Sequence, residues 1–200
     1  MLALVALVGT VIGVFDAAPY IRDTLRGSTR PHRGTWLIWM SLSWVVLASN
    51  RADGAVWSML PLAAQALQNC AIFFLSIRRG EGGVDTWDRV MLAVAGFGVV
   101  GWFTFTDPTL ATLAVILADV MGAVMMLPKA WRDPSSETIS TFVLSSAVGA
   151  CALVAVGGFT FSLVIYPVYY ILVNAIIAGV LIYRRAVIGA LEIDASGDGA

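Results

Sequence analysis

The chain has 200 residues, of which 59% are hydrophobic and 12% charged, and its formal net charge at pH 7 is −1. Soluble domains carry roughly 25% charged residues, so this composition argues against a water-soluble fold. The charge balance offers no basic surface, and we expect no nucleic-acid partner. Apolar runs of roughly 17 to 25 residues separate the charge clusters, and that length suits a helix crossing a lipid bilayer.

These runs predict an all-α membrane protein with seven transmembrane helices. We place the helices at 2–21, 35–50, 55–77, 89–105, 109–129, 138–157 and 160–183. No basic residue precedes the first run and it contains Asp16, which favours a retained helix over a signal peptide. The segment 186–200 is predicted to be a disordered tail.

Basic residues occur in alternate loops of this arrangement. Eleven fall on one side of the membrane, and only Arg51 falls on the other. The eleven are Arg22, Arg26, Arg30, Arg33, Arg78, Arg79, Arg89, Lys129, Arg132, Arg184 and Arg185. Because basic loops stay in the cytoplasm, we predict a multi-pass protein of the inner (plasma) membrane with its N-terminus outside and its C-terminus cytoplasmic.

Two parts of the chain carry the same residues in the same order. Gly13 and Pro19 correspond to Gly122 and Pro128, Asn69 corresponds to Asn174, and the pair Arg78-Arg79 corresponds to Arg184-Arg185. We interpret them as two parallel three-helix repeats joined by a linker helix, a 3+1+3 layout. The predicted units are 1–79, the linker 80–107, the second repeat 108–185 and the tail 186–200.

This layout, the proline near the end of each first helix and the paired asparagines resemble the PQ-loop and SWEET superfamily of membrane transporters. The signature dipeptide reads Pro19-Tyr20 and Pro128-Lys129 in this chain. The resemblance implies that Asn69 and Asn174 line a substrate pocket. The Trp-rich segment WLIWMSLSW, residues 36–44, is similar to nicotinamide riboside transporters of the PnuC type.

Three polar residues are predicted to lie near the middle of the membrane. Asn69, Asn174 and Asp119 each precede a basic residue by nine or ten positions, which places them roughly 14–15 Å from the basic boundary. Paired amides suit a polar solute, or they join helices by hydrogen bonds. Gln65, one turn from Asn69, extends this polar surface or serves packing.

The buried carboxylates have two interpretations each. Asp119 is a candidate for proton coupling or a structural hydrogen-bond acceptor. Asp16 is a weaker candidate for proton coupling, and we expect it to cap the backbone freed by Pro19 or to pair with Arg22 or Arg26. Pro19 and Pro128 are expected to end the first helix of each repeat, either as gate hinges or as simple terminators.

The sequence favours a transporter of a small polar solute, such as a sugar, amino acid or related metabolite, working by alternating access. The alternatives are a non-transporting membrane receptor or scaffold and a PnuC-like nucleoside or vitamin transporter. We expect no enzyme, no cofactor and no metal, and we interpret His32 as a solvated loop residue. The expected partners are the solute, the lipid bilayer and further copies of the chain, since Gly9 and Gly13 allow close helix contact.

Overall fold

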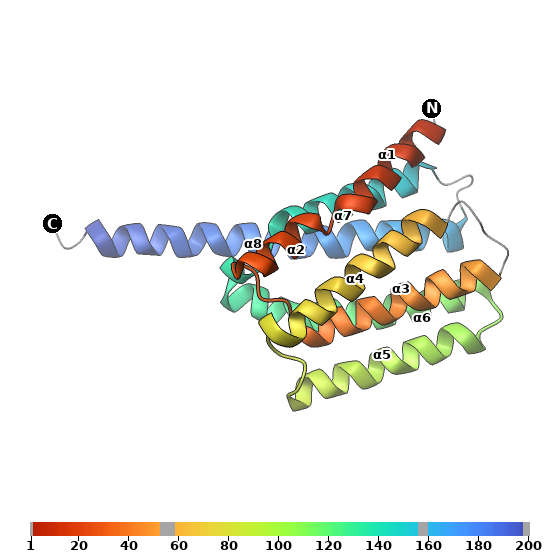
Figure 1. Ribbon diagram of the computed structural model, residues 1–200, viewed down its shortest axis with the longest axis horizontal. Helices are drawn as coiled ribbons and strands as arrows, with labels where there is room; N and C mark the ends of the chain where they lie inside the picture. Colours follow the sequence, from red (N-terminus) through yellow and green to blue (C-terminus); the bar gives the residue numbers. More distant parts are fainter. Residues whose placement is uncertain (1, 53–58, 156–159, 198–200) are drawn as a thin grey trace.

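The computed structural model describes residues 2–52, 59–155 and 160–197 (Figure 1). Its helices are α1 (Leu2–Phe15), α2 (Ala18–Arg26), α3 (Arg33–Ala52), α4 (Met59–Arg79), α5 (Thr86–Thr104), α6 (Pro108–Arg132), the 3-10 turn η1 (Pro134–Ser136), α7 (Ile139–Ala155) and α8 (Phe161–Gly197). The described chain forms no strand, so the all-helical class is confirmed. The predicted helix boundaries at 55 and 157 lie outside the described residues.

Three helical segments of the described chain are long and apolar enough to cross a bilayer. They are Leu2–Arg26, which comprises α1 and α2, Thr109–Arg132 in α6 and Leu163–Leu191 in α8. Large apolar side chains also cover the surface; Phe15, Phe97 and Leu172 are all more than half exposed. Such a surface is stable in lipid and not in water. The protein is therefore embedded in a membrane, while the full number of spans and their direction stay predictions.

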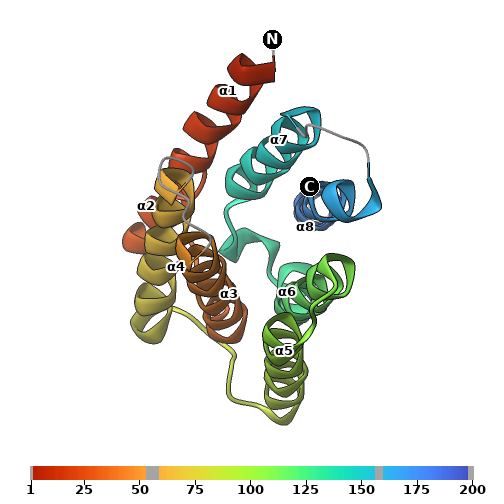
Figure 2. The same cartoon turned by 90° about the vertical axis from the view of Figure 1, so that its right-hand side faces the viewer.

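The helices form two groups with the same packing order. In the first group α4 packs between α1 and α3, and in the second α8 packs between α6 and α7. The groups meet where α1 packs on α7 and α3 packs on α6, and α5 lies along α6 (Figure 2). This ring of helices surrounds the space in which the candidate site lies.

The first predicted helix is two helices. α1 ends at Phe15, and Pro19 lies in the first turn of α2 instead of ending the helix before it. Proline suits a first turn because its missing N–H would have no partner there. The side chain of Gln68 bridges the break: its Nε2 donates to the carbonyl of Gly13 at 3.1 Å, and its Oε1 accepts from the N–H of Ala17 at 3.2 Å.

Two further expectations about helix ends are wrong. Pro128 lies inside α6, which continues to Arg132, where the guanidinium Nε donates to the Pro128 carbonyl at 3.1 Å. α8 does not stop near 183 but runs to Gly197, and it extends beyond the other helices (Figure 1). The segment 186–197, predicted to be disordered, is helical; it contains three Ala and no proline, which is compatible with continuation of α8.

Gly9 and Gly13 serve packing within the chain. A Cβ added to Gly9 would lie 2.6 Å from the Cβ of Cys151 on α7, so α1 and α7 are in close contact there. A Cβ added to Gly13 would contact Val148, which also lies on α7. The close helix contact that Gly9 allows is thus made within the chain, and association between copies stays a prediction.

Candidate functional site

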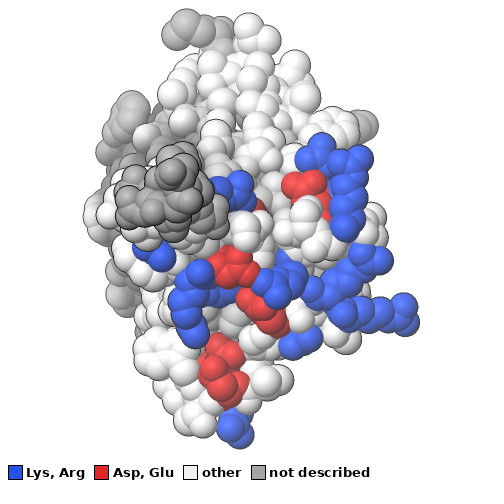
Figure 3. Space-filling view, turned by 90° about the vertical axis from the view of Figure 1, so that its left-hand side faces the viewer, with Lys and Arg blue, Asp and Glu red and all other residues white. Residues whose placement is uncertain are grey.

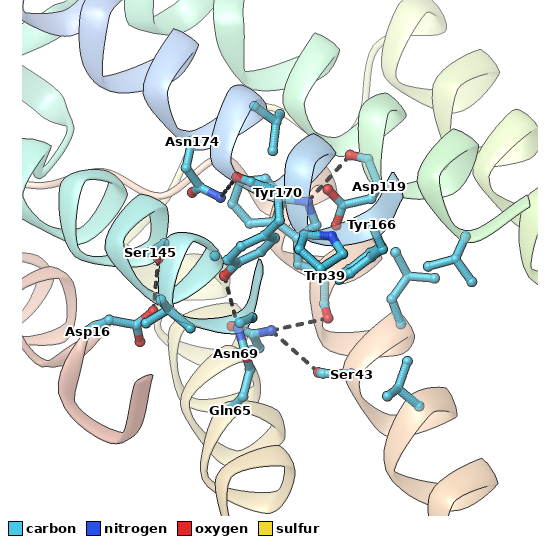
Figure 4. A pocket seen from close by; sticks show the side chains of 18 of the residues that line it. Asp16, Trp39, Ser43, Gln65, Asn69, Asp119, Ser145, Tyr166, Tyr170 and Asn174 are labelled. Carbon is cyan, nitrogen blue, oxygen red and sulfur yellow. Dashed lines mark hydrogen bonds between the residues drawn. The ribbon is translucent and has the colours of Figure 1, made fainter. Parts of the chain in front are cut away.

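A cavity of about 450 Å³ lies between the two helix groups (Figure 4). This volume is typical of sites for small molecules. The cavity extends along the bundle, because Trp36 and Val46 of α3 both line it and ten residues of helix span roughly 15 Å. Residues of α3, α4, α5, α6, α7 and α8, together with the break after α1, contribute to its wall.

Most of the predicted site residues meet at this cavity. Five of them line it: Asp16, Gln65, Asn69, Asp119 and Asn174. Pro19 and Pro128 do not belong to the lining and lie closer to one end of the bundle. Residues of both helix groups therefore share one cavity, and the two prolines lie outside its lining.

The two asparagines are anchored through their amide nitrogens. The Nδ2 of Asn69 donates to the carbonyl of Trp39 at 3.2 Å and to the hydroxyl of Ser43 at 3.4 Å. The Nδ2 of Asn174 donates to the carbonyl of Tyr170 at 2.9 Å, one turn earlier in α8. Within the described chain the side-chain hydrogen bonds of both residues run through nitrogen, which leaves their carbonyl oxygens to accept from a ligand.

The two carboxylates of the cavity accept hydrogen bonds from hydroxyl groups. Asp119, 8% exposed, accepts from the phenol of Tyr169 at 2.6 Å, and Asp16, 5% exposed, accepts from the hydroxyl of Ser145 at 2.8 Å. Neither carboxylate pairs with a basic residue of the described chain. The expected pairing of Asp16 with Arg22 or Arg26 is wrong, because the helix break turns Asp16 toward α7.

Aromatic side chains are the part of the cavity that the sequence interpretation missed. Trp39, Tyr166 and Tyr170 line it, and the rings of Tyr166 and Tyr170 stack with centroids 6.0 Å apart. The phenol of Tyr170 also accepts a hydrogen bond from the Nε2 of Gln65 at 3.4 Å. The signal was present, since Tyr166, Tyr170 and Asn174 recur every four residues and therefore share one face of a helix.

Four side chains linked by hydrogen bonds and an ion pair lie at one end of the cavity, where Trp36 belongs to its lining. We call them the basic-end cluster: Tyr20, Trp36, Lys129 and Glu137. The phenol of Tyr20 donates to Glu137 at 2.7 Å and accepts from the indole of Trp36 at 3.1 Å, while Lys129 forms an ion pair with Glu137. All four side chains are buried. Burial raises the pKa of Glu137, and the charge of Lys129 and the hydrogen bonds from Lys129 and Tyr20 oppose that rise.

Loop charges surround this cluster, and Figure 3 shows Lys and Arg gathered with acidic residues on that end of the molecule. Arg30 pairs with Asp133 and approaches Glu81 at 3.8 Å. The hydrogen bond from Ser135 and the charge of Arg30 lower the pKa of Asp133. We call this face the basic end; its contacts join the loop after α2 to the loop before α7.

His32 is buried rather than solvated, contrary to the sequence interpretation. It is 5% exposed, and its Nε2 lies 3.5 Å from a carboxylate oxygen of Asp88 at the start of α5. The Nδ1 accepts from the backbone N–H of Thr35 at 3.3 Å. Burial lowers the pKa of His32, with the charge of Asp88 opposing the shift. His32 therefore joins the loop after α2 to α5.

The fold and the cavity define a class: a helical membrane protein with a polar and aromatic cavity between two groups of helices. No family model, no curated protein and no solved structure matches the chain. The function is therefore argued from the cavity itself.

Proposed function

We propose that the protein is a transporter of small polar solutes that works by alternating access. The observation that carries the proposal is the shared cavity, to which both helix groups contribute an asparagine and a carboxylate. A cavity between two helix groups suits a binding site in many transporters, since movement of one group against the other exposes it to each side in turn.

The proposed architecture is two parallel three-helix repeats with α5 as the linker. The matching packing orders α1–α4–α3 and α6–α8–α7 support it. So does the pairing between groups, because the first helix of each group packs on the second helix of the other. That exchange is expected of repeats related by a two-fold axis along the membrane normal.

The basic-end cluster is the proposed gate on the cytoplasmic side. Tyr20 and Lys129 follow the prolines of the two repeats, and both bind Glu137, which precedes α7. Release of Glu137, together with the Arg30–Asp133 pair, would loosen the contact between the two groups at this end and let the cavity open there. The break at Asp16–Ala17, which the side chain of Gln68 bridges, gives α2 a place to pivot.

Asp119 is the proposed site of proton coupling. An ionisable side chain inside a membrane-spanning helix costs free energy, and such residues usually have a functional role. Asp119 lines the cavity, so water in the cavity could exchange protons with it. The phenol of Tyr169 can donate to the ionised carboxylate, and it holds the side chain in place when the proton leaves.

Uptake into proteoliposomes tests the proposal. The purified protein is reconstituted, and a panel of labelled sugars, amino acids, nucleosides and amines is supplied with and without an inward proton gradient. We expect uptake of at least one solute, lost in the variant Asn69→Ala/Asn174→Ala. As a matched control, Ser41→Ala removes a hydroxyl that bonds only the carbonyl of Leu37 in its own helix.

Equal uptake by wild type and the double asparagine variant would refute the site. Absence of flux for every solute, together with a protein partner that copurifies stoichiometrically, would favour the receptor interpretation instead.

A further inference from the structure

We infer that the cavity takes a small organic cation whose positive charge lies between Asp16 and Asp119 and whose apolar part lies against aromatic rings. The inference rests on the proposed function and names the substrate class for the same cavity. It begins from an imbalance of charge. The lining contains two carboxylates and no Lys, Arg or His within the described chain.

Neither carboxylate has a basic partner in the part of the chain that the structure describes. Each accepts from a hydroxyl, Tyr169 for Asp119 and Ser145 for Asp16, and neither lies within ion-pair distance of a described basic residue. Lys129, the basic residue buried nearest the cavity end, is already paired with Glu137. A buried carboxylate in a protein is paired, protonated or bound to a cation, and a cationic ligand that competes with the proton would supply the partner that the described residues do not.

The aromatic rings favour an organic cation over a metal ion. Tyr166 and Tyr170 form a stacked pair, and Trp39 lies edge-on to Trp36 at a centroid distance of 5.1 Å; all four residues line the cavity. Ring faces attract quaternary and protonated amines. Figure 4 shows Tyr166 and Trp39 beside Asp119, so charge and ring face can act on one group.

A buried hydroxyl provides an independent sign of a ligand. Thr141 of α7 lines the cavity at 4% exposure, and its Oγ1 has no hydrogen-bond partner among the described residues. A buried hydroxyl without a partner is costly, and native proteins usually pair such groups. Thr141 precedes Ser145 by one helical turn and therefore lies on the same face as the residue that binds Asp16. The hydroxyl is occluded, so a rotation of the Thr141 side chain would bring it to a hydroxyl, amide or carbonyl of the ligand.

The expected ligand thus combines a positive charge, a polar group and an apolar or planar body within about 450 Å³. A neutral sugar would leave the carboxylates without a partner, and an anion would be repelled by both. The proposal therefore separates amines and quaternary ammonium compounds from neutral sugars among the candidate solutes.

Binding to the purified protein in nanodiscs tests the inference through tryptophan fluorescence and thermal shift. The probes are matched in shape: choline against its neutral carbon analogue 3,3-dimethylbutan-1-ol, and benzyltrimethylammonium against benzyl alcohol. Sodium chloride and glucose complete the panel. We expect at least one organic cation to bind roughly tenfold more tightly than its neutral partner, and we expect no response to sodium or glucose.

Variants then locate the charge. Asp119→Asn and Asp16→Asn keep the shape of the side chain, and each should weaken cation binding by roughly tenfold or more. Asp107→Asn is the control: Asp107 caps the start of α6 outside the cavity lining, and asparagine caps as well as aspartate. It should leave binding unchanged.

Equal binding of cations and neutral analogues by the wild type would overturn the inference, even if the variants failed to fold. So would a response to no organic cation, a response to sodium in place of organic cations, or cation binding that both cavity variants retain. Cation binding without flux in liposomes would refute the transporter and leave the site intact. Flux of neutral solutes without cation binding would refute the site and leave the transporter intact.

Discussion

The phenol of Tyr20 donates to the carboxylate of Glu137 at 2.7 Å, although 117 residues separate them in the chain. Because Lys129 pairs with the same carboxylate, residues of α2 and α6 hold one acid that precedes α7. This arrangement joins the two helix groups at the basic end and closes the cavity there.

Removal of one partner from this cluster should destabilise the protein more than removal of both. Lys129→Met leaves Glu137 as an unpaired buried carboxylate, and we expect a loss of about 3–5 kcal/mol in the free energy of unfolding. Adding Glu137→Gln should restore more than half of that loss. Denaturation of the four proteins in mixed micelles gives the coupling energy. Additive losses would contradict the role assigned to the cluster.

Gln68 should contribute to the stability of the fold only while α1 and α2 are separate helices. Gln68→Ala leaves the N–H of Ala17 and the carbonyl of Gly13 without their partner, at a cost of about 1–3 kcal/mol. Pro19→Ala permits these groups to bond directly in a continuous helix. In that background the cost of Gln68→Ala should fall below about 1 kcal/mol. An unchanged cost would show that Gln68 stabilises the protein by other contacts.

Close packing of α1 on α7 depends on the absence of a side chain at Gly9. Gly9→Ala places a methyl group against Cys151, and overpacking of this kind costs about 1–3 kcal/mol. Gly179→Ala in α8 is the matched control, because a Cβ there meets nothing within 4 Å. Thermal unfolding in detergent should show a lower midpoint for Gly9→Ala alone. An equal effect of the two substitutions would contradict the packing argument.

Burial of His32 makes stability depend on pH near neutrality. Burial holds the pKa of His32 below its ordinary value of 6.5, so the unfolded chain takes up the proton first as the pH falls. The contribution of His32 is therefore present above pH 6.5 and is lost as the pH falls through the lower folded pKa. Unfolding between pH 7.5 and pH 5 should become less pH-dependent in His32→Gln. Identical slopes would show that His32 does not contribute in this range.

The distance from the basic boundary predicted a common depth for three polar residues. It brought Asn69, Asn174 and Asp119 to one cavity because helices of constant rise begin from a common end. The aromatic wall was missed because Trp and Tyr residues in membrane proteins also serve as interface anchors, and position along the chain does not distinguish these roles.

Helix ends were predicted less well, for two physical reasons. Proline is compatible both with a first turn and with the last turns of a helix, and Pro19 and Pro128 show one case each. Arg184 was interpreted as the end of the last helix, yet its guanidinium lies 4.7 Å from the ring centroid of Trp131 and bonds the Trp131 carbonyl. Because Arg184 contacts α6 from the side of α8, the pair Arg184-Arg185 lies within α8 and does not end it.

A reversible cross-link at the basic end tests alternating access most directly. The hydroxyls of Thr29 and Thr138 lie 2.7 Å apart across the two groups, so cysteines at these positions would come within reach of a disulfide. The pair is introduced with Cys70 and Cys151 replaced by alanine. Oxidation should stop solute uptake into proteoliposomes, and a reducing agent should restore it. Undiminished uptake by the fully cross-linked protein would contradict a cavity that must open at this end.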